Sequence, residues 1–175
     1  GTGFVFDILT KRYKSGKKIF YGIDPAQGML NIAKRKINDE RVNFIKGTFE
    51  NIPLKDNSVD KIISTLAMHW VSSIEDSLKE LKRILKPNGT LDIIMIEKND
   101  GKKIKKTVFK AMKKHLSMKK IISAAKLIQR ISKEELRFKI LKFFNLNKQN
   151  NLTIKNKKEL IYGTCDEHLN WWKAR

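Results

Sequence analysis

The chain has 175 residues, 41% of them hydrophobic, and a formal net charge of +20 at pH 7. This length suffices for one domain with its own core, and no apolar run approaches the length of a membrane span. The only cysteine, Cys165, excludes an internal disulfide and fits a reducing compartment, so we expect a cytoplasmic protein.

Helical and strand patterns alternate through the first hundred residues. The patterns predict helices at 4–14, 27–37 and 74–85 and strands at 18–23, 42–46, 59–64 and 90–97. The apolar positions expected on the buried helix faces are Met29, Ile32, Ala33 and Ile37, then Leu78, Leu81, Ile84 and Leu85. Gly89, just after Pro87, is the expected stop of the third helix. Alternating helices and strands predict a parallel sheet, and the apolar runs at 62–63 and 93–96 favour buried strands.

A glycine turn opens the chain, and an acid closes the first predicted strand. Gly1-Thr2-Gly3 leads into the first helix, and Asp24 follows the strand at 18–23. Glycines let the backbone approach a ligand, and a carboxylate at a strand end can accept hydrogen bonds from ribose hydroxyls. The layout favours a nucleotide-like ligand, although similar glycine turns also end strands that bind nothing.

Five passages in this order resemble class I S-adenosylmethionine-dependent methyltransferases. They are GTG at 1–3, DPAQGML at 24–30, GTFENIPL at 47–54, NSVDKIIS at 57–64 and LKRILKPNGTL at 81–91. LAMHWV at 66–71 is most similar to the branch of small-molecule and carrier-protein methyltransferases, which includes the malonyl-carrier-protein and trans-aconitate enzymes. The resemblance implies a Rossmann-like, doubly wound, mostly parallel α/β sheet whose first strand is missing from this chain. It also implies S-adenosyl-L-methionine as the cofactor.

The resemblance carries over to particular residues of the cofactor site. These residues are Gly1, Thr2, Gly3, Asp24, Pro25, Met29, Thr48, Phe49 and Leu66. Thr48 departs from the pattern, because the family often has an acid at the adenine position. A hydroxyl still accepts a hydrogen bond, but more weakly than a carboxylate does.

His69 and Trp70 are the candidate acceptor-site residues, since they follow the fourth strand of the resembled fold. Ligands bind at the carboxyl ends of open parallel sheets, where His69 could act as a base and Trp70 could wall the pocket. The alternative is a packing role for both, and a carboxylate acceptor needs no base. With one cysteine and scattered histidines, we expect no metal site.

The excess positive charge is concentrated in one segment. Residues 1–100 carry 17 Lys+Arg and 13 Asp+Glu, whereas residues 101–150 carry 16 and 2. We expect three parts: a cofactor-binding core at 1–100, a basic helical lid at 101–150 inserted after the fifth strand, and a return segment at 151–175. The lid would suit an anionic partner such as an acidic carrier protein, a phosphate-bearing substrate, an anionic membrane surface or RNA. A solvated lysine-rich surface in a lysine-rich proteome is the alternative.

These observations favour a methyltransferase acting on a small carboxylate or a carrier-bound acyl group. A catalytically silent protein that uses the fold for binding or assembly is a second hypothesis, motivated by Thr48 and the weak catalytic set. An RNA methyltransferase is a third, motivated only by charge, because no RNA-binding module is visible.

Overall fold

The computed structural model of the chain describes residues 1–144 except residues 15, 99 and 127–129. The predicted return segment at 151–175 lies outside the described residues. In chain order the elements are α1 Phe4–Arg12, β1 Phe20–Asp24, α2 Gln27–Lys36, β2 Val42–Lys46, β3 Val59–Thr65, the 3-10 helix η1 Met68–Trp70, α3 Ile74–Ile84, β4 Leu85–Ile94, α4 Lys102–His115, α5 Met118–Lys126 and α6 Lys133–Phe144.

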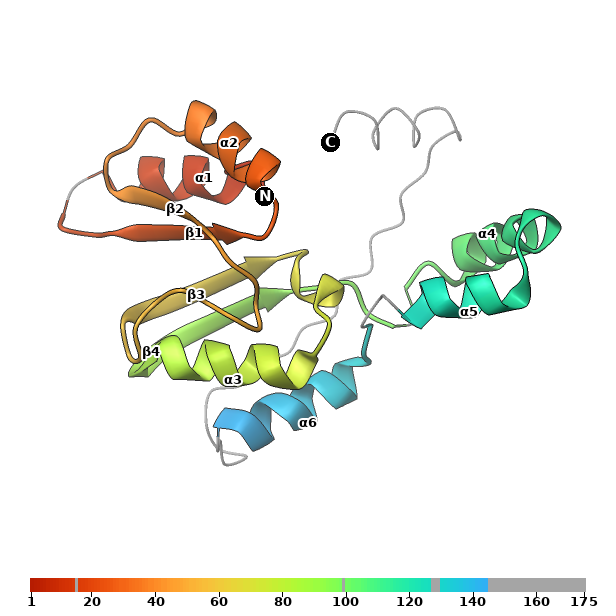
Figure 1. Ribbon diagram of the computed structural model, residues 1–175. Coiled ribbons are helices and arrows are strands. Elements are labelled where there is room, and N and C mark those ends of the chain that lie inside the picture. The colour runs from red at the N-terminus through yellow and green to blue at the C-terminus, as the bar shows by residue number, and fades with distance from the viewer. Residues whose placement is uncertain (15, 99, 127–129, 145–175) are drawn as a thin grey trace.

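The four strands form two parallel pairs, β1 with β2 and β3 with β4. Figure 1 shows their arrows running the same way in the spatial order β2, β1, β3, β4. The prediction of an α/β fold with parallel strands is therefore confirmed. In this arrangement the carboxyl ends of all four strands lie toward one edge, which is where open parallel sheets bind ligands.

Helices α1 and α2 lie beside β1 and β2 (Figure 1). Phe6 of α1 packs edge-on against Phe44 of β2, with ring centroids 5.4 Å apart. Gly22 of β1 lies beneath both rings, since a Cβ there would come within 2.6 Å of Phe44 and 2.9 Å of Phe6. In α2 the buried residues are Leu30 and Ala33. The placement of Ile32 on the buried face was wrong: Ile32 is exposed, because Leu30 and Ala33, three residues apart, occupy that face.

The main core lies between α3, α6 and the pair β3–β4. Leu78, Leu81 and Ile84 are buried, as the helical spacing predicted. Ile140 of α6 joins the same cluster. The Lys139 ammonium of α6 pairs with the Glu75 carboxylate of α3, which fixes the two helices across their exposed side. Helix α6 therefore packs on the body of the molecule.

Two expectations about β4 were wrong. Helix α3 ends at Ile84, one residue before its predicted end, but Gly89 is not its stop, because the strand runs Leu85–Ile94 rather than 90–97. Leu85 pairs with Val59, and pairing then resumes with Thr90 opposite Lys61, so residues 86–89 form a bulge. Gly89 permits the bulge, because a Cβ there would lie 2.6 Å from the Leu85 side chain.

The expectation that the apolar runs of β3 and β4 are buried throughout was also wrong. Ile62 and Ile93 pack against the core, but Ile63 and Ile94 are exposed. Successive strand residues point to opposite faces, so only the alternate residues meet the helix layer formed by α3.

The basic segment at 101–150 divides into separate helices. Helices α4 and α5 pack as a hairpin that extends away from the sheets, whereas α6 returns to α3 (Figure 1). Within the part of the chain that the structure describes, no helix is both long and apolar enough to cross a membrane.

Candidate functional site

Asp24 lies at the carboxyl end of β1 and meets the opening turn of the chain. Its Oδ1 accepts a hydrogen bond from the Ala26 backbone N–H at 2.8 Å, and its Oδ2 contacts the backbone nitrogen of Gly1. The Asp24 carbonyl accepts from the Gly47 N–H at 3.3 Å. The structure therefore brings together Gly1, Asp24 and the loop that carries Thr48.

Gly3 begins α1 in the left-handed region, with φ of 85°. A Cβ at Gly3 would lie 3.1 Å from the Ile37 side chain and 3.4 Å from the Ala33 backbone, so a glycine lets this turn rest against α2. Met29 is half-buried one turn into α2, and Pro25 is exposed in the turn before it. Thr2 is half-buried.

Thr48 and Phe49 follow β2 but face different surroundings. Thr48 is exposed, and its backbone exchanges two hydrogen bonds of 3.3 Å with Asn51. Phe49 is half-buried and packs against the main core. Thr48 is thus accessible to a ligand at the strand ends, whereas Phe49 contributes at least part of its surface to packing.

Glu50 ties the loop after β2 to the start of α3. Its Oε1 accepts hydrogen bonds from the Ser72 N–H at 2.7 Å, the Ser72 hydroxyl at 2.8 Å and the Ser73 N–H at 3.3 Å. Burial alone would raise the pKa of Glu50, but these hydrogen bonds hold the pKa below its usual value. The carboxylate is therefore ionised at neutral pH.

Two charged residues of α3 fasten the same loop farther along. The Glu80 carboxylate accepts from the Ile52 N–H at 2.9 Å, and the Arg83 guanidinium donates to the carbonyls of Ile52 and Leu54. Sequence reasoning missed Glu50, Glu80 and Arg83. The spacing of Glu80 and Arg83 indicates a helix-surface pair, but it does not indicate the distant backbone groups that both also bind.

Leu66 directly follows β3 with φ of 52°, a conformation that a side chain rarely adopts. Its N–H donates to the Ile94 carbonyl at 2.7 Å, which holds the backbone in this position. Unusual backbone of this kind gathers at functional sites. The exposed Leu66 side chain lies at the same sheet edge as Asp24 and Thr48.

His69 and Trp70 have opposite environments. His69 is only 1% exposed, whereas Trp70 is 57% exposed, and their ring centroids lie 5.1 Å apart. Burial lowers the pKa of His69, and the nearby charge of Arg130 lowers it further. His69 is therefore neutral at neutral pH, and Trp70 stands at the molecular surface.

Three buried polar atoms have no hydrogen-bond partner among the described residues. They are the Ser64 hydroxyl, His69 Nδ1 and Arg130 Nε. Ser64 is near the end of β3 and His69 follows it, while Arg130 precedes Ile131, whose carbonyl accepts from Lys98 beyond β4. Sequence reasoning missed Ser64 and Arg130. Nothing in a segment so rich in basic residues distinguishes one arginine.

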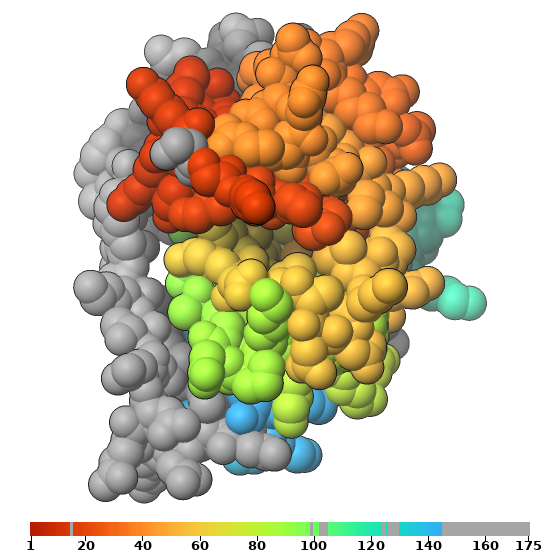
Figure 2. All heavy atoms as spheres, turned by 90° about the vertical axis from the view of Figure 1, so that its left-hand side faces the viewer, coloured from red at the N-terminus to blue at the C-terminus, as the bar shows by residue number. Residues whose placement is uncertain are grey.

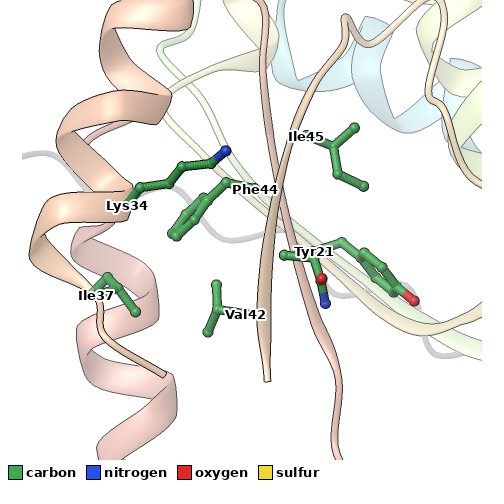
Figure 3. Close-up of a pocket in the computed structure, with 7 residues that line it drawn as sticks. Tyr21, Lys34, Ile37, Val42, Phe44 and Ile45 are labelled. Atoms are coloured by element: carbon green, nitrogen blue, oxygen red, sulfur yellow. The ribbon is translucent and has the colours of Figure 1, made fainter. Parts of the chain in front are cut away.

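A hollow of about 420 Å³ lies elsewhere, along the outer edge of β2. Figure 3 shows Lys34 of α2 and Ile37, which follows that helix, beside Phe44 and Val42, with Tyr21 on the other side of the strands. This hollow contains none of the predicted site residues. It is a surface depression of the sheet edge and is separate from the strand ends.

The described residues include no group of three or more His, Cys, Asp or Glu side chains that could hold a metal ion.

Comparison with known proteins identifies relatives over the first half of the chain. The family described as "Methyltransferase domain" matches residues 1–93. A malonyl-[acyl-carrier protein] O-methyltransferase of Priestia megaterium is 33% identical over 91 residues, which are 52% of this chain and 32% of the relative. The ubiquinone/menaquinone biosynthesis C-methyltransferase UbiE of Campylobacter jejuni is 34% identical over 103 residues, which are 57% of this chain and 43% of the relative. The chain thus spans less than half the length of either relative.

Solved structures match over a longer stretch. A SAM-dependent methyltransferase of Thermotoga maritima has a TM-score of 0.54 and 30% identity, covering 71% of this chain and 54% of that protein. A methyltransferase bound to the Trm112 methyltransferase activator of Haloferax volcanii has a TM-score of 0.60 and 23% identity, covering 82% and 57%. The second match shows a shared fold and nothing further. These two matches confirm the Rossmann-like fold expected from the sequence.

Proposed function

This chain belongs to the methyltransferase-domain family, and on that premise we propose that the protein transfers a methyl group from S-adenosylmethionine to a carboxylate. The acceptor would be a small organic acid or a carrier-bound acyl group. The matching family, the relative of Priestia megaterium and the neighbour of Thermotoga maritima all carry the name methyltransferase, which favours this proposal over a silent binding protein or an RNA methyltransferase.

The donor would bind across the carboxyl ends of β1, β2 and β3. The Asp24 carboxylate has acceptor capacity beyond its bond from Ala26, so it can receive hydrogen bonds from two ribose hydroxyls. Gly3 keeps the adjoining turn close to α2, and the exposed Thr48 can accept from an adenine amino group. These residues fit the donor. Pro25, Met29, Phe49 and Leu66 stay predictions as further contacts.

The acceptor proposal rests on one observation: three buried polar atoms lack partners near the ends of β3 and β4. An unpaired buried donor costs free energy, so such groups commonly meet a ligand. Arg130 offers a charged N–H, and neutral His69 and Ser64 can each donate one more hydrogen bond. A carboxylate is an acceptor that suits such donors, and the charge of Arg130 acts on His69, so these two side chains lie near each other.

This arrangement assigns His69 a positioning role. S-adenosylmethionine, when bound, supplies an electrophilic methyl group on its sulfonium. A carboxylate oxygen is already a nucleophile, so no proton has to be removed. Arg130 and His69 would hold the carboxylate in one orientation, and the apolar side chains of Met68 and Val71 would exclude water. Trp70, at the rim, would contact the rest of the acceptor.

We also infer that one more parallel strand belongs between β1 and β3. On β1, the residues whose peptide groups bond to β2 alternate with Tyr21 and Ile23. The peptide groups of Tyr21 and Ile23 therefore face the edge of β1 that is turned away from β2. On β3, Ile63 and Thr65 face the opposing edge in the same way. A chain extended ahead of Gly1 should protect these amides from solvent exchange. Equal exchange in the extended and present chains would contradict this inference.

The donor site is tested by calorimetric titration with S-adenosylmethionine. Asp24→Ala should weaken binding by about 1.5–3 kcal/mol, the range for lost charge-assisted hydrogen bonds. Asp60→Ala is the matched control, since Asp60 is an exposed acid near the opposite end of β3. Equal affinities of the two folded variants would remove Asp24 from the donor site.

The acceptor site is tested by release of S-adenosylhomocysteine with a series of dicarboxylic acids and malonyl thioesters. Arg130→Gln should raise the acceptor KM about 10- to 100-fold, because it removes a charged hydrogen bond, and it should leave the donor Kd unchanged. Arg137→Gln, an exposed arginine of α6, should change neither quantity. If Arg130→Gln alters the donor Kd instead, Arg130 does not serve the acceptor.

A further inference from the structure

The hairpin of α4 and α5 is a surface that the proposed donor and acceptor sites do not use. Its turn lies at the end farthest from the sheets (Figure 1). Figure 2 looks at the opposite side of the molecule, so only a few teal atoms of the hairpin are visible, at the right-hand edge. Residues 102–126 include ten lysines and no acid. A feature of this kind presents its charge away from the body of the protein.

The tip of the hairpin combines exposed apolar and basic side chains. Leu116 and Met118 flank the turn and are 41% and 45% exposed. Exposed lysines surround them in sequence: Lys113, Lys114, Lys119 and Lys120. We call these six residues the hairpin tip.

The apolar side chains continue along both helices. Val108 and Phe109 of α4 and Ile122 of α5 are exposed, while Ile121 is buried where the hairpin closes. The Lys113 ammonium lies 5.5 Å from the centre of the Phe109 ring, so a basic side chain borders the apolar stripe. Both helices are thus amphipathic, with an apolar stripe left uncovered at the surface.

Charge alone would suit several polyanions, and the apolar side chains distinguish between them. RNA attracts lysines but offers no apolar phase for Leu116, Met118 and Ile122, and an acidic protein offers them only bounded apolar patches between its charges. An anionic bilayer offers both, because lysines meet the headgroups while apolar side chains enter the acyl boundary. Lysine stems are long enough to bridge these two levels.

We propose that the hairpin tip docks on an anionic lipid bilayer, with Leu116 and Met118 inserted and the four lysines among the headgroups. The docked chain would remain peripheral. The strand-end site would face the water layer next to the bilayer, so docking would concentrate the protein near acceptors held at that surface. This inference does not rest on the proposed methyl transfer.

Vesicle co-sedimentation with the full chain tests the proposal. Vesicles of phosphatidylcholine with about 30% phosphatidylglycerol are compared with pure phosphatidylcholine. The chain should bind the anionic vesicles at least 10-fold more tightly, and added salt should weaken binding. Leu116→Ser with Met118→Ser should weaken binding to anionic vesicles about 10-fold, although no charge changes.

A second pair of variants separates the tip from overall charge. Changing the four tip lysines to Gln should reduce anionic-vesicle binding at least 10-fold. Lys14 and Lys17 are exposed in the loop after α1, and Lys34 and Lys36 are exposed on α2; changing these four lysines to Gln should have little effect. Circular dichroism checks that each variant stays folded.

Three outcomes would overturn the proposal. One is wild-type chain that binds heparin but no anionic vesicles, which would assign the lysines to a polyanion other than lipid. The second is full binding by the Leu116 and Met118 variant, which would reduce the contact to surface charge. The third is equal loss in both lysine variants, which would mean that the tip has no special role.

Discussion

Replacing Glu50 with alanine should destabilise the fold by about 2 kcal/mol. The carboxylate accepts two short hydrogen bonds from Ser72 and one longer bond from Ser73. A hydrogen bond to a charged group contributes roughly 1.5–3 kcal/mol, and water can reach Ser72 to replace part of that loss. Glu50→Gln keeps an accepting oxygen and should cost about 1 kcal/mol.

The sign of the pH dependence follows from the lowered pKa of Glu50. A carboxyl group whose folded pKa lies below its unfolded value stabilises the fold above the unfolded pKa, about 4.5. That contribution is lost as the pH falls through the folded pKa. The stability difference between wild type and Glu50→Gln should therefore shrink as the pH drops below about 4.5.

Urea unfolding followed by circular dichroism measures these differences at pH 7 and at lower pH. Glu40→Ala is the matched control, because Glu40 is an exposed acid whose side chain has no hydrogen bond or ion pair with the residues that the structure describes. The reasoning is refuted if Glu50→Ala costs no more than Glu40→Ala. If the stability difference between wild type and Glu50→Gln does not vary with pH, the argument from the charge of Glu50 is refuted, whereas the argument from its hydrogen bonds is not.

Three further predictions concern the core and the buried histidine. Leu78→Ala should lower the free energy of unfolding by about 3 kcal/mol, since Leu78 is completely buried, and urea unfolding should detect a loss well above 1 kcal/mol. Gly22→Ala should cost about 1–3 kcal/mol in the same assay, because its Cβ would collide with Phe44 and Phe6; no loss would mean that the rings move aside freely. His69 has a lowered folded pKa, so wild-type stability should fall as the pH drops below about 6.5, where only the unfolded imidazole takes up a proton. His69→Gln should remove this decline between pH 6.5 and 5, and a decline that persists would assign it to another group.

The secondary structure of the first hundred residues could be predicted because the local patterns agree with one another. The strand at Val42–Lys46 has the predicted bounds, and α2 differs from its prediction only at its last residue. The start of β4 could not be predicted in this way. Gly89 and Pro87 look like a helix stop, but Leu85 already pairs with Val59, and only tertiary structure reveals that pairing.

The positions of the candidate site residues could be predicted only where backbone position determines them. Asp24, Gly3 and Thr48 follow directly from strand ends and a glycine turn, so sequence order places them. Arg130 comes near His69 through the folding of distant segments, and the missing hydrogen bonds of Ser64 and Arg130 among the described residues are visible only in three dimensions. The exposure of Ile32 and Ile63 was missed for a related reason, because a pattern tells which residues share a face but not whether that face is covered.

The pairing of the strands has a consequence for how the described residues unfold. The amino-terminal unit comprises α1, β1, α2 and β2, and among the described residues it shares no strand ladder with β3 and β4. The two halves meet through the loop after β2, which Glu80 and Arg83 of α3 bind and from which Glu50 binds the start of α3. Phe49 of this loop and Ile23 of β1 also pack on the core. Side-chain contacts couple neighbouring units less strongly than a continuous ladder does. Without the strand inferred between β1 and β3, the described residues should therefore behave as two cooperative units, and the amino-terminal unit, which has the smaller buried core, should open first while α3 and α6 remain folded.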